Sequence, residues 1–311
     1  MSEQPVDPAP SPGGPGTYDL PMHGIQITNT GGADEMQWVD LADPTAGDGR
    51  VVVDVDAAGV NFIDTYQRSG LYPIELPYVL GLEGAGTIVE VGRGVDGYEV
   101  GDRVAWATGP GSYAERVSVP AGALLRVPDG VAGDVAAAVP LQGMTAHYLA
   151  VDTYPLGPGD RCLIHAGAGG VGLLLIQIAK LRGAEVFTTV GTPEKAELAA
   201  GAGADHTILY RDVDFASAVV DIAGERPLDV VYDGVGKSVF TASLGLLRRR
   251  GTMATFGNAS GPVDPVSPLE LSSNGSLFLT RPTLFDHATS PEEIGRRASD
   301  LFGWIEAGDL D

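Results

Sequence analysis

The chain has a single cysteine, Cys162, among its 311 residues. One thiol excludes an intramolecular disulfide framework and any metal cluster held by several thiolates. Such sparing use of cysteine fits a reducing compartment, and we predict a cytoplasmic protein. Because Cys162 lies in a short apolar stretch, we expect it to be a small buried residue of a strand rather than a nucleophile.

Long hydrophobic runs are also missing. The strongest, from Val171 to Ala179, is interrupted by Gly172 and Gln177 and is far shorter than the roughly 20 residues that cross a bilayer. The first eighteen residues contain five prolines but neither the basic stretch nor the apolar stretch of a signal peptide. We therefore expect no membrane insertion, and we interpret 1–18 as a disordered tail.

Basic residues are scarce: 19 Lys and Arg face 41 Asp and Glu, for a formal net charge of −22. Lysine is almost absent, with only Lys180, Lys195 and Lys237. Binding to nucleic acid or to anionic lipid relies on bases that displace counterions, so we expect no nucleic-acid partner. The composition resembles that of proteins from salt-loving organisms, in which salt screens the repulsion between carboxylates, and a halophilic source is a hypothesis that follows.

The chain length predicts two domains, and the pattern of predicted secondary structure changes near Pro140. Before it, short β-rich runs at 51–55, 87–91 and 103–107 alternate with glycine and proline. After it, strand-like and helix-like segments alternate as in βαβ units, which predicts an α/β domain with a doubly wound parallel sheet. The predicted strands are 161–165, 185–190, 206–210, 229–233 and 252–256, and the predicted helices are 171–182, 193–200, 215–223, 239–250 and 291–307.

Three consecutive arginines, Arg248, Arg249 and Arg250, end the predicted helix 239–250 just before Gly251. We interpret them as bases that complement the helix dipole, followed by a capping glycine, rather than as an anion site. The last predicted helix begins after Ser290, whose side chain is suited to cap it.

A glycine-rich loop follows the first predicted strand and opens the first predicted helix. Its sequence at 167–172, GAGGVG, matches the G-x-G-x-x-G pattern. Glycines let the backbone turn sharply and approach a pyrophosphate, which the N–H groups and dipole of the following helix attract. The loop predicts a dinucleotide site formed by Gly167, Gly169, Gly170, Val171 and Gly172; the alternative is a tight turn without a ligand.

The end of the second predicted strand indicates which dinucleotide binds. NAD enzymes usually place an acid there for the ribose hydroxyls, whereas this strand runs into Gly191, Thr192 and, three residues on, Lys195. Thr192 and Lys195 suit a 2′-phosphate, so we predict NADPH (NADP), with Tyr210 beside the adenine or reaching the same phosphate. The alternative is that Thr192 caps the next helix and Lys195 is solvated.

Several stretches of the sequence closely resemble one family. They are 61–73 (NFIDTYQRSGLYP), 165–172 (HAGAGGVG), 256–258 (FGN) and 280–282 (TRP). The family is NADPH:quinone oxidoreductase, the zeta-crystallin-like, zinc-free branch of the medium-chain dehydrogenases, and the resemblance runs from about residue 20 to the end. It implies a Rossmann NADPH-binding domain at 144–282 and a GroES-like, mainly β catalytic domain at 19–143, to which 283–311 returns.

The zinc ligands of related enzymes are replaced in this sequence. Zinc-dependent relatives carry Cys-His-x-Asp where this chain has NFID at 61–64, and Gly-His-Glu where it has GLE at 81–83. Because the thiolate and imidazole ligands are gone, we expect no metal. The five histidines are scattered without ligand spacing, and we interpret them as structural or surface residues.

The resemblance also implies which residues form the cleft between the domains. It places Asn61, Tyr66 and Tyr72 along the cleft, Thr145 near the nicotinamide and Arg281 on the far wall, with Tyr72 and Arg281 on the substrate side. The cofactor-binding residues that it implies are Asn61, Tyr66, Thr145, Phe256, Gly257, Leu279 and Thr280. The alternatives are structural: the tyrosines could fill the β-domain core, Asn61 could satisfy a turn, and Arg281 could pair with an acid.

Without a Lewis acid, hydride must pass to an acceptor that takes it readily, which favours quinones and conjugated enones over alcohols. We therefore expect a zinc-independent NADPH:quinone oxidoreductase. The alternative enzyme reduces the double bond of an alkenal, an enone or an enoyl thioester with NADPH. A cofactor-binding structural or RNA-binding protein is a third hypothesis, against which the net charge counts.

Two further expectations come from the resemblance. Family members continue past the last predicted helix with a segment that helps to close the cofactor site, so we expect this chain to be shortened at its C-terminus. They also imply a homodimer formed through the nucleotide-binding domains.

Overall fold

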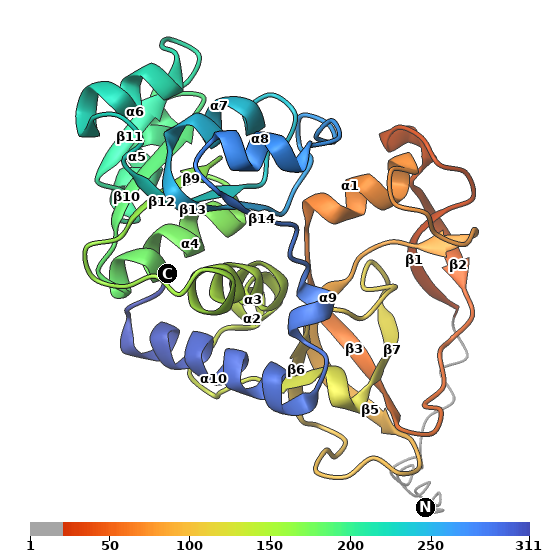
Figure 1. Ribbon diagram of the computed structural model, residues 1–311. Coiled ribbons are helices and arrows are strands. Elements are labelled where there is room, and N and C mark those ends of the chain that lie inside the picture. Colours follow the sequence, from red (N-terminus) through yellow and green to blue (C-terminus); the bar gives the residue numbers. More distant parts are fainter. Residues whose placement is uncertain (1–20) are drawn as a thin grey trace, which may run out of the picture.

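The computed structural model describes residues 21–311, so the predicted tail at 1–18 lies outside the described residues. Three sheets are arranged in two halves. The parallel sheet with its helices forms one half and the antiparallel sheets form the other, with α2 (Gly133–Ala138) and α3 (Pro140–Tyr148) between them (Figure 1). This is the predicted α/β architecture with a mainly β domain.

The first half of the chain forms antiparallel sheets with the strand orders β7-β3-β5-β6-β8 and β2-β1-β4. Their strands are β1 (Met22–Ile27), β2 (Gln37–Leu41), β3 (Arg50–Gly59), β4 (Tyr78–Val79), β5 (Glu83–Val91), β6 (Arg103–Trp106), β7 (Arg116–Pro120) and β8 (Leu124–Arg126). Val51 and Val53 of β3 pack with Ile88, Val104 and Trp106 in a core of their own. Helix α1 (Phe62–Ser69) follows β3 and leads toward the other half.

The second half forms a six-stranded parallel sheet in the order β11-β10-β9-β12-β13-β14. The strands are β9 (Arg161–His165), β10 (Glu185–Val190), β11 (His206–Leu209), β12 (Leu228–Asp233), β13 (Leu247–Thr255) and β14 (Phe278–Thr280). The helices are α4 (Gly170–Leu181), α5 (Pro193–Gly201), α6 (Phe215–Ala223), α7 (Phe240–Leu246), α8 (Pro268–Ser273), α9 (Leu284–His287) and α10 (Pro291–Ala307). Strand order reverses between β9 and β12, and ligands of such sheets bind at the carboxyl ends of the strands at this point.

The predicted helix 239–250 is wrong in its second part. Helix α7 ends at Leu246, and Arg248, Arg249 and Arg250 lie in β13 rather than at a helix end. Leu247 pairs with Leu228 of β12, and Arg248 forms an ion pair with Asp229 of the same strand. These contacts with a distant segment outweigh the local helical pattern. The sheet also contains β14, which the sequence reading does not include among its five strands.

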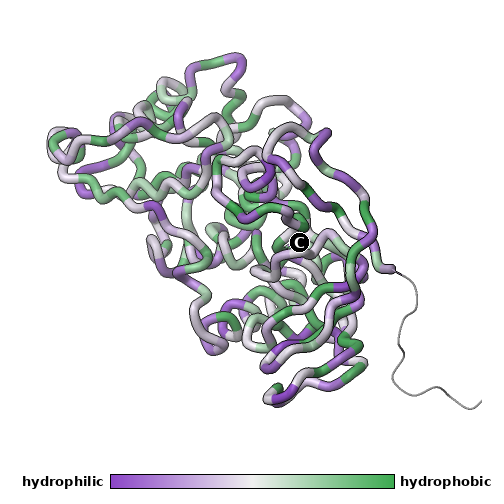
Figure 2. The backbone as a smooth tube through the Cα atoms, turned by 90° about the vertical axis from the view of Figure 1, so that its right-hand side faces the viewer, coloured by the Kyte–Doolittle hydropathy of each residue, from purple (hydrophilic) through white to green (hydrophobic). Residues whose placement is uncertain are grey.

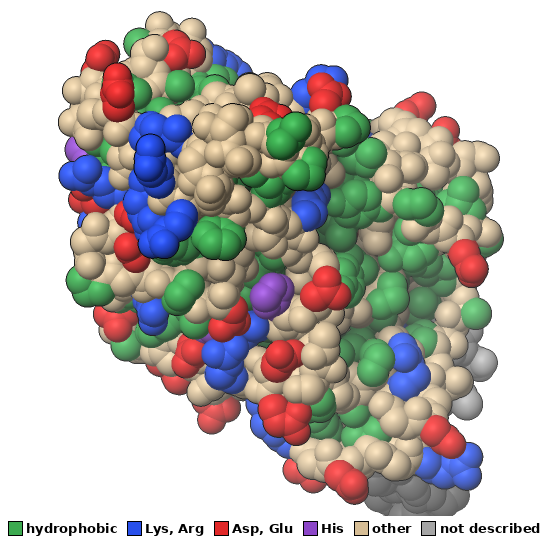
Figure 3. Space-filling view, viewed as in Figure 1, with side chains coloured by type: hydrophobic (Ala, Val, Ile, Leu, Met, Phe, Trp, Pro, Cys, Tyr) green, Lys and Arg blue, Asp and Glu red, His purple; other side chains and the backbone are tan. Residues whose placement is uncertain are grey.

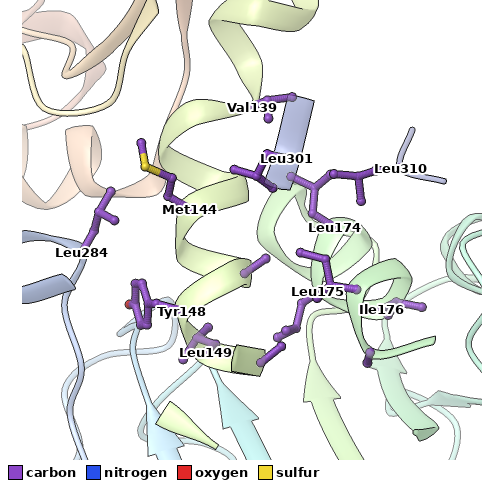
Figure 4. Close-up of a cluster of buried hydrophobic side chains, with 14 of the residues drawn as sticks. Val139, Met144, Tyr148, Leu149, Leu174, Leu175, Ile176, Leu284, Leu301 and Leu310 are labelled. Atoms are coloured by element: carbon purple, nitrogen blue, oxygen red, sulfur yellow. The ribbon is translucent and has the colours of Figure 1, made fainter. Parts of the chain in front are cut away.

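One hydrophobic core joins the two halves around α3. Met144 and Tyr148 of α3 belong to a buried cluster with Leu175 of α4 and Leu301 of α10 (Figure 4). The same cluster includes Leu125 of the antiparallel sheet. Because side chains from both sheets share this core, their relative placement is fixed by close packing.

Hydrophobic and hydrophilic residues alternate in short stretches along the chain (Figure 2). Within residues 21–311, the helices are all too short or too polar to cross a membrane.

A buried arginine fastens α10 to this core. The Arg297 side chain is 1% exposed, and its Nη2 lies 2.6 Å from Oδ2 of Asp152. Its Nε donates to the carbonyl oxygen of His287 at 2.8 Å, and its Nη1 donates to Nδ1 of His147 at 2.9 Å. Since a guanidinium only donates, Nε2 of His147 carries the ring hydrogen that bonds Asp300 at 2.8 Å. Burial lowers the pKa of His147, which keeps this ring neutral.

Replacing Arg297 by methionine is expected to lower the free energy of unfolding by about 3 kcal/mol, because Asp152 loses a buried partner. The neighbouring Arg296 supplies the control, since it contacts the same carboxylate at 3.2 Å from an exposed position. Arg296→Ala is expected to change the free energy by less than about 1 kcal/mol. Urea unfolding followed by circular dichroism measures both variants, and equal effects would contradict this account of Arg297.

Candidate active site

A cleft of about 670 Å³ opens between the two halves, at the carboxyl ends of β9, β10 and β13. Hydrophobic side chains line the hollow between the halves (Figure 3). The predicted site residues that line the cleft are Asn61, Tyr66, Tyr72, Thr145, Gly169, Gly170, Val171, Gly172, Gly191, Lys195, Tyr210, Phe256, Gly257 and Arg281. Residues more than 200 positions apart in the sequence thus meet at one place.

Four predicted cofactor residues lie outside this lining: Gly167, Thr192, Leu279 and Thr280. A Cβ on Gly167 would overlap the hydroxyl of Thr188, so the packing of the loop after β9 against β10 requires this glycine. Thr192 caps α5, because its Oγ1 accepts from the Lys195 N–H at 3.4 Å. Leu279 and Thr280 belong to the edge strand β14, where Leu279 packs against the core of the sheet.

The glycine loop presents open backbone to the cleft. A Cβ on Gly172 would come within 2.5 Å of the carbonyl oxygen of Ala166, so this glycine lets the helix approach the loop. A Cβ on Gly169 would meet only that carbonyl oxygen, at 3.2 Å, and would otherwise fill space open to the cleft. Gly169 is the N-cap of α4 and no side chain caps this helix. An anion could therefore bind at this loop, where the N–H groups and dipole of α4 would attract it.

Lys195 is a cation without an ion pair in this part of the cleft. Of the three lysines, Lys180 pairs with Asp205 at 2.7 Å and Lys237 pairs with Asp264 at 3.5 Å. Lys195 is exposed and has no ion pair in residues 21–311. Since a Cβ on Gly191 would lie 2.9 Å from the Tyr210 hydroxyl, that hydroxyl sits close to the loop after β10. A lysine and a phenol together suit a phosphate next to this loop.

The opposite part of the cleft carries phenol and guanidinium groups. Tyr66 accepts a hydrogen bond from the Asn258 N–H at 2.8 Å, and Tyr72 accepts one from Nη2 of Arg281 at 3.1 Å. Both phenol oxygens act as acceptors, so their own hydrogens remain to be donated. The rings of Tyr66 and Tyr72 lie 5.0 Å apart, and Phe62 continues the row at 5.3 Å from Tyr66. The wall therefore offers aromatic surface together with several hydrogen-bond donors.

The histidine at the end of β9 lines the cleft in one fixed form. Ser243 donates its hydroxyl to the Val239 carbonyl at 2.8 Å, so it accepts from Nε2 of His165, which lies 2.8 Å away. The other ring nitrogen accepts from the Thr189 hydroxyl at 2.9 Å. Burial lowers the pKa of His165 to about 3, so the ring is neutral at physiological pH. Both ring nitrogens are thus used in contacts with Thr189 and Ser243.

A buried carboxyl group that the sequence reading does not assign lies behind Asn61. Oε2 of Glu83 accepts from Nδ2 of Asn61 at 2.7 Å, and Oε1 accepts from the Leu141 N–H at 2.7 Å. Burial raises the pKa of Glu83 to about 7. The sequence shows Glu83 only as the last residue of a motif that has lost its histidine, and its position next to Asn61 becomes visible only in three dimensions.

The donor set at this position does not suit zinc. Asn61 offers an amide whose nitrogen is bonded to Glu83, Leu82 offers no donor, and both Glu83 oxygens accept hydrogen bonds. Residues 21–311 contain no group of three or more His, Cys, Asp or Glu side chains that could hold a metal ion. Catalytic zinc normally takes three nitrogen, sulfur or carboxylate ligands.

Comparison with known proteins agrees with this geometry. Residues 47–129 match the family described as alcohol dehydrogenase GroES-like domain, and residues 170–299 match the family described as zinc-binding dehydrogenase. The two matches define a two-domain dehydrogenase with a GroES-like and a Rossmann-type domain.

The full-length relatives identify the family within this class. A quinone oxidoreductase of Pseudomonas aeruginosa is 46% identical over 288 residues, covering 92% of this chain and 89% of that protein. A 2-haloacrylate reductase of Burkholderia is 42% identical, covering 91% and 88%. A mycobacterial protein solved in complex with NADPH is 48% identical, with a TM-score of 0.90 and coverage of 93% of this chain and 90% of that one. The chain belongs to the quinone oxidoreductase family.

Substitution of Lys195 by alanine is expected to raise the dissociation constant for NADPH by about tenfold to a hundredfold, because the 2′-phosphate loses a charged partner. The dissociation constant for NADH, which lacks this phosphate, is expected to stay unchanged. Lys237→Ala is the matched control, since that lysine pairs with Asp264 away from the cleft. Nicotinamide fluorescence titration measures all of these values. An equal loss for NADPH and NADH would contradict the phosphate role.

Glu83 is expected to make stability depend on pH. Its pKa rises from 4.5 to about 7 on folding, so the protonated form is favoured in the folded state, and the associated stability is lost as pH rises through about 7. Relative to a Glu83→Gln variant, the protein is expected to lose roughly 3 kcal/mol of unfolding free energy between about pH 4 and pH 8. Urea unfolding at several pH values measures this difference. A difference that stays constant with pH would show that Glu83 titrates normally.

Proposed function

We propose that the protein is an NADPH-dependent, zinc-independent quinone reductase. The observation that carries this function is the composition of the cleft: a glycine loop and an unpaired Lys195 at one end, and aromatic surface with hydroxyl and guanidinium donors at the other. The relatives named quinone oxidoreductase and the NADPH complex of a similar mycobacterial protein support the same assignment.

The dinucleotide end of the cleft has residues that fit NADPH. The open backbone at Gly169 and the start of α4 would hold the pyrophosphate, and Lys195 with Tyr210 would hold the 2′-phosphate. We assign Asn61 and Thr145 to the nicotinamide end, where Asn61 is 6% and Thr145 is 7% exposed. NADPH, when bound, supplies a hydride to the acceptor.

The acceptor end of the cleft supplies hydrogen-bond donors. When a quinone is reduced, its oxygens gain negative charge, and donors aimed at them lower the barrier. We assign this task to the hydroxyls of Tyr66 and Tyr72 and the guanidinium of Arg281. Both phenol oxygens already accept from N–H groups of the other half, so they keep their own hydrogens to donate. Arg281 has no ion pair with an acid in the described residues, so its charge is available to the acceptor. The apolar side chains of Phe62 and Phe285 line the same cleft.

A second candidate function is the reduction of a carbon–carbon double bond conjugated to a carbonyl or carboxylate. The similarity to a 2-haloacrylate reductase favours it, since that protein shares nearly the whole chain. The same donors would then stabilise the oxygen of an enolate.

The division of the chain into domains is part of the proposal. We assign 19–143 to the catalytic domain, 144–282 to NADPH binding, and 283–311 to a segment that returns to the catalytic domain. Contacts of α10 with α3 and β8 support this return. The boundary near 143 falls inside α3, so the two domains share this helix.

Three properties of the whole protein complete the proposal. The exposed Phe278 on the edge strand β14 and the exposed Leu269 of α8 support a homodimer formed through the nucleotide-binding domains. The single buried cysteine supports a cytoplasmic location. The net charge of −22 supports function in concentrated salt.

A panel of acceptors tests the function. With NADPH and without added metal, kcat/KM for 1,4-benzoquinone is expected to exceed that for a short alkenal and for 2-chloroacrylate by at least about tenfold. The reason is that a quinone accepts hydride without a Lewis acid. Steady-state loss of NADPH absorbance measures each rate. A preference for the alkenal or the haloacrylate would replace the first function by the second, and binding of NADPH without turnover of any acceptor would contradict both.

A further inference from the structure

Glu83, the first residue of β5, is a carboxyl group that the proposed reaction does not use. Its side chain is 0% exposed, and no ion pair joins it to a cation in residues 21–311. Burying a carboxyl group without an opposite charge is unfavourable unless hydrogen bonds satisfy it. The two bonds that Glu83 accepts are therefore what hold it in this place.

These two bonds join helices that line the cleft. Asn61 is the N-cap of α1, and Leu141 lies in the first turn of α3, which also carries Thr145. The fold makes room for the carboxyl group at Gly59, where a Cβ would overlap Oε2 of Glu83. Glu83 thus bonds two helices that line the cleft, in a space that a glycine provides. This position indicates that Glu83 helps to hold the cleft residues in place.

Asn61 is held from two sides. Its backbone N–H donates to Oδ2 of Asp64 at 2.9 Å, and the same oxygen accepts from the Tyr113 hydroxyl at 2.6 Å. Its side-chain nitrogen donates to Glu83 at 2.7 Å. Because Glu83 takes the NH₂ end of the amide, the carbonyl end accepts from the Asp64 N–H in the capping box of α1 and keeps a second lone pair for a molecule in the cleft.

We propose that Glu83 is a positioning residue for NADPH: it fixes the Asn61 amide so that the amide oxygen accepts a hydrogen bond from a hydroxyl or N–H group of the bound dinucleotide. The proposal rests on NADPH being the cofactor of this cleft. It assigns to Glu83 no contact with the cofactor, because Glu83 acts through Asn61.

A carboxyl group suits this task better than an amide. Glu83 faces two donors, and the Leu141 N–H cannot rotate because it belongs to the backbone. In a Glu83→Gln variant the one remaining carbonyl oxygen stays with Leu141, so the new NH₂ group faces Asn61. The Asn61 amide must then turn over and present its NH₂ group to the cleft, which reverses the polarity offered to the dinucleotide.

The test compares four forms of the full chain: the unchanged protein, Glu83→Gln, Asn61→Asp, and the double variant Glu83→Gln/Asn61→Asp. The dissociation constant for NADPH, measured by nicotinamide fluorescence without acceptor, is the main readout. In the double variant an aspartate oxygen accepts from the new NH₂ group, and the second oxygen faces the cleft as an acceptor again. Aspartate is also a good N-cap, so α1 keeps its cap.

Glu83→Gln is expected to raise the dissociation constant at least about tenfold, the effect of a misplaced hydrogen-bond partner. Asn61→Asp alone is expected to raise it as well, because two carboxyl groups then face each other. The double variant is expected to return to within about threefold of the unchanged protein. Glu185→Gln is the matched control; Glu185 bonds Arg161 and His206 at the far end of the sheet, and its replacement is expected to leave NADPH binding unchanged.

Two results would overturn the proposal. One is a normal dissociation constant in Glu83→Gln or in Asn61→Asp. The other is a double variant that binds no better than Glu83→Gln, because a role of Glu83 in capping α3 alone would not be repaired at Asn61. If Glu83→Gln does not fold, the effect of Asn61→Asp and its repair in the double variant decide the matter. Failure of the unchanged protein to bind NADPH would instead contradict the proposed function.

Discussion

Helix α3 packs against α4 of the nucleotide-binding half and against strands β5 and β6 of the other half, and the geometry of the cleft depends on this packing. The helix is almost entirely buried, and it contributes Met144 and Tyr148 to the core that both halves share. With the two sheets held at one distance, residues from α1 and from the ends of β13 and β14 face each other across the cleft. The hydrogen bonds from Asn258 to Tyr66 and from Arg281 to Tyr72 form only because of this arrangement.

The charge of the chain constrains how the site can work. An anionic protein is expected to repel an anionic dinucleotide. Attraction must therefore come from individual groups in the cleft rather than from the net charge of the chain. The open start of α4 supplies N–H groups, and Lys195 is kept free of acids whereas the other two lysines are paired. The cation on the acceptor side is likewise free of acids: Arg281 bonds a carbonyl oxygen and a phenol but no acid in the described residues. Electrostatic attraction in this molecule is therefore a short-range property of the cleft.

The sequence predicts those structural features that are determined by residues close to one another in the chain. The glycine loop, the Thr192 cap and five of the six strands of the parallel sheet each carry a local signal, and each is found. The helix 239–250 fails because its second part looks like a helix end, while pairing with β12 makes it a strand. The role of Glu83 could not be predicted from the sequence, because its two hydrogen-bond donors, Asn61 and Leu141, lie 22 and 58 positions away. Only the family resemblance indicates Leu279 and Thr280 as cofactor residues, and they lie in the edge strand β14, outside the residues that line the cleft.

We propose that one cleft passes hydride from NADPH to a quinone without a metal ion. The most direct measurement is a single turnover, in which the protein saturated with NADPH is mixed with 1,4-benzoquinone in the presence of a chelator. We expect one NADPH to be consumed per quinone reduced, at a rate that falls when the transferred hydrogen of NADPH is replaced by deuterium. Loss of the reaction on chelation, or no consumption of NADPH by the quinone, would contradict it.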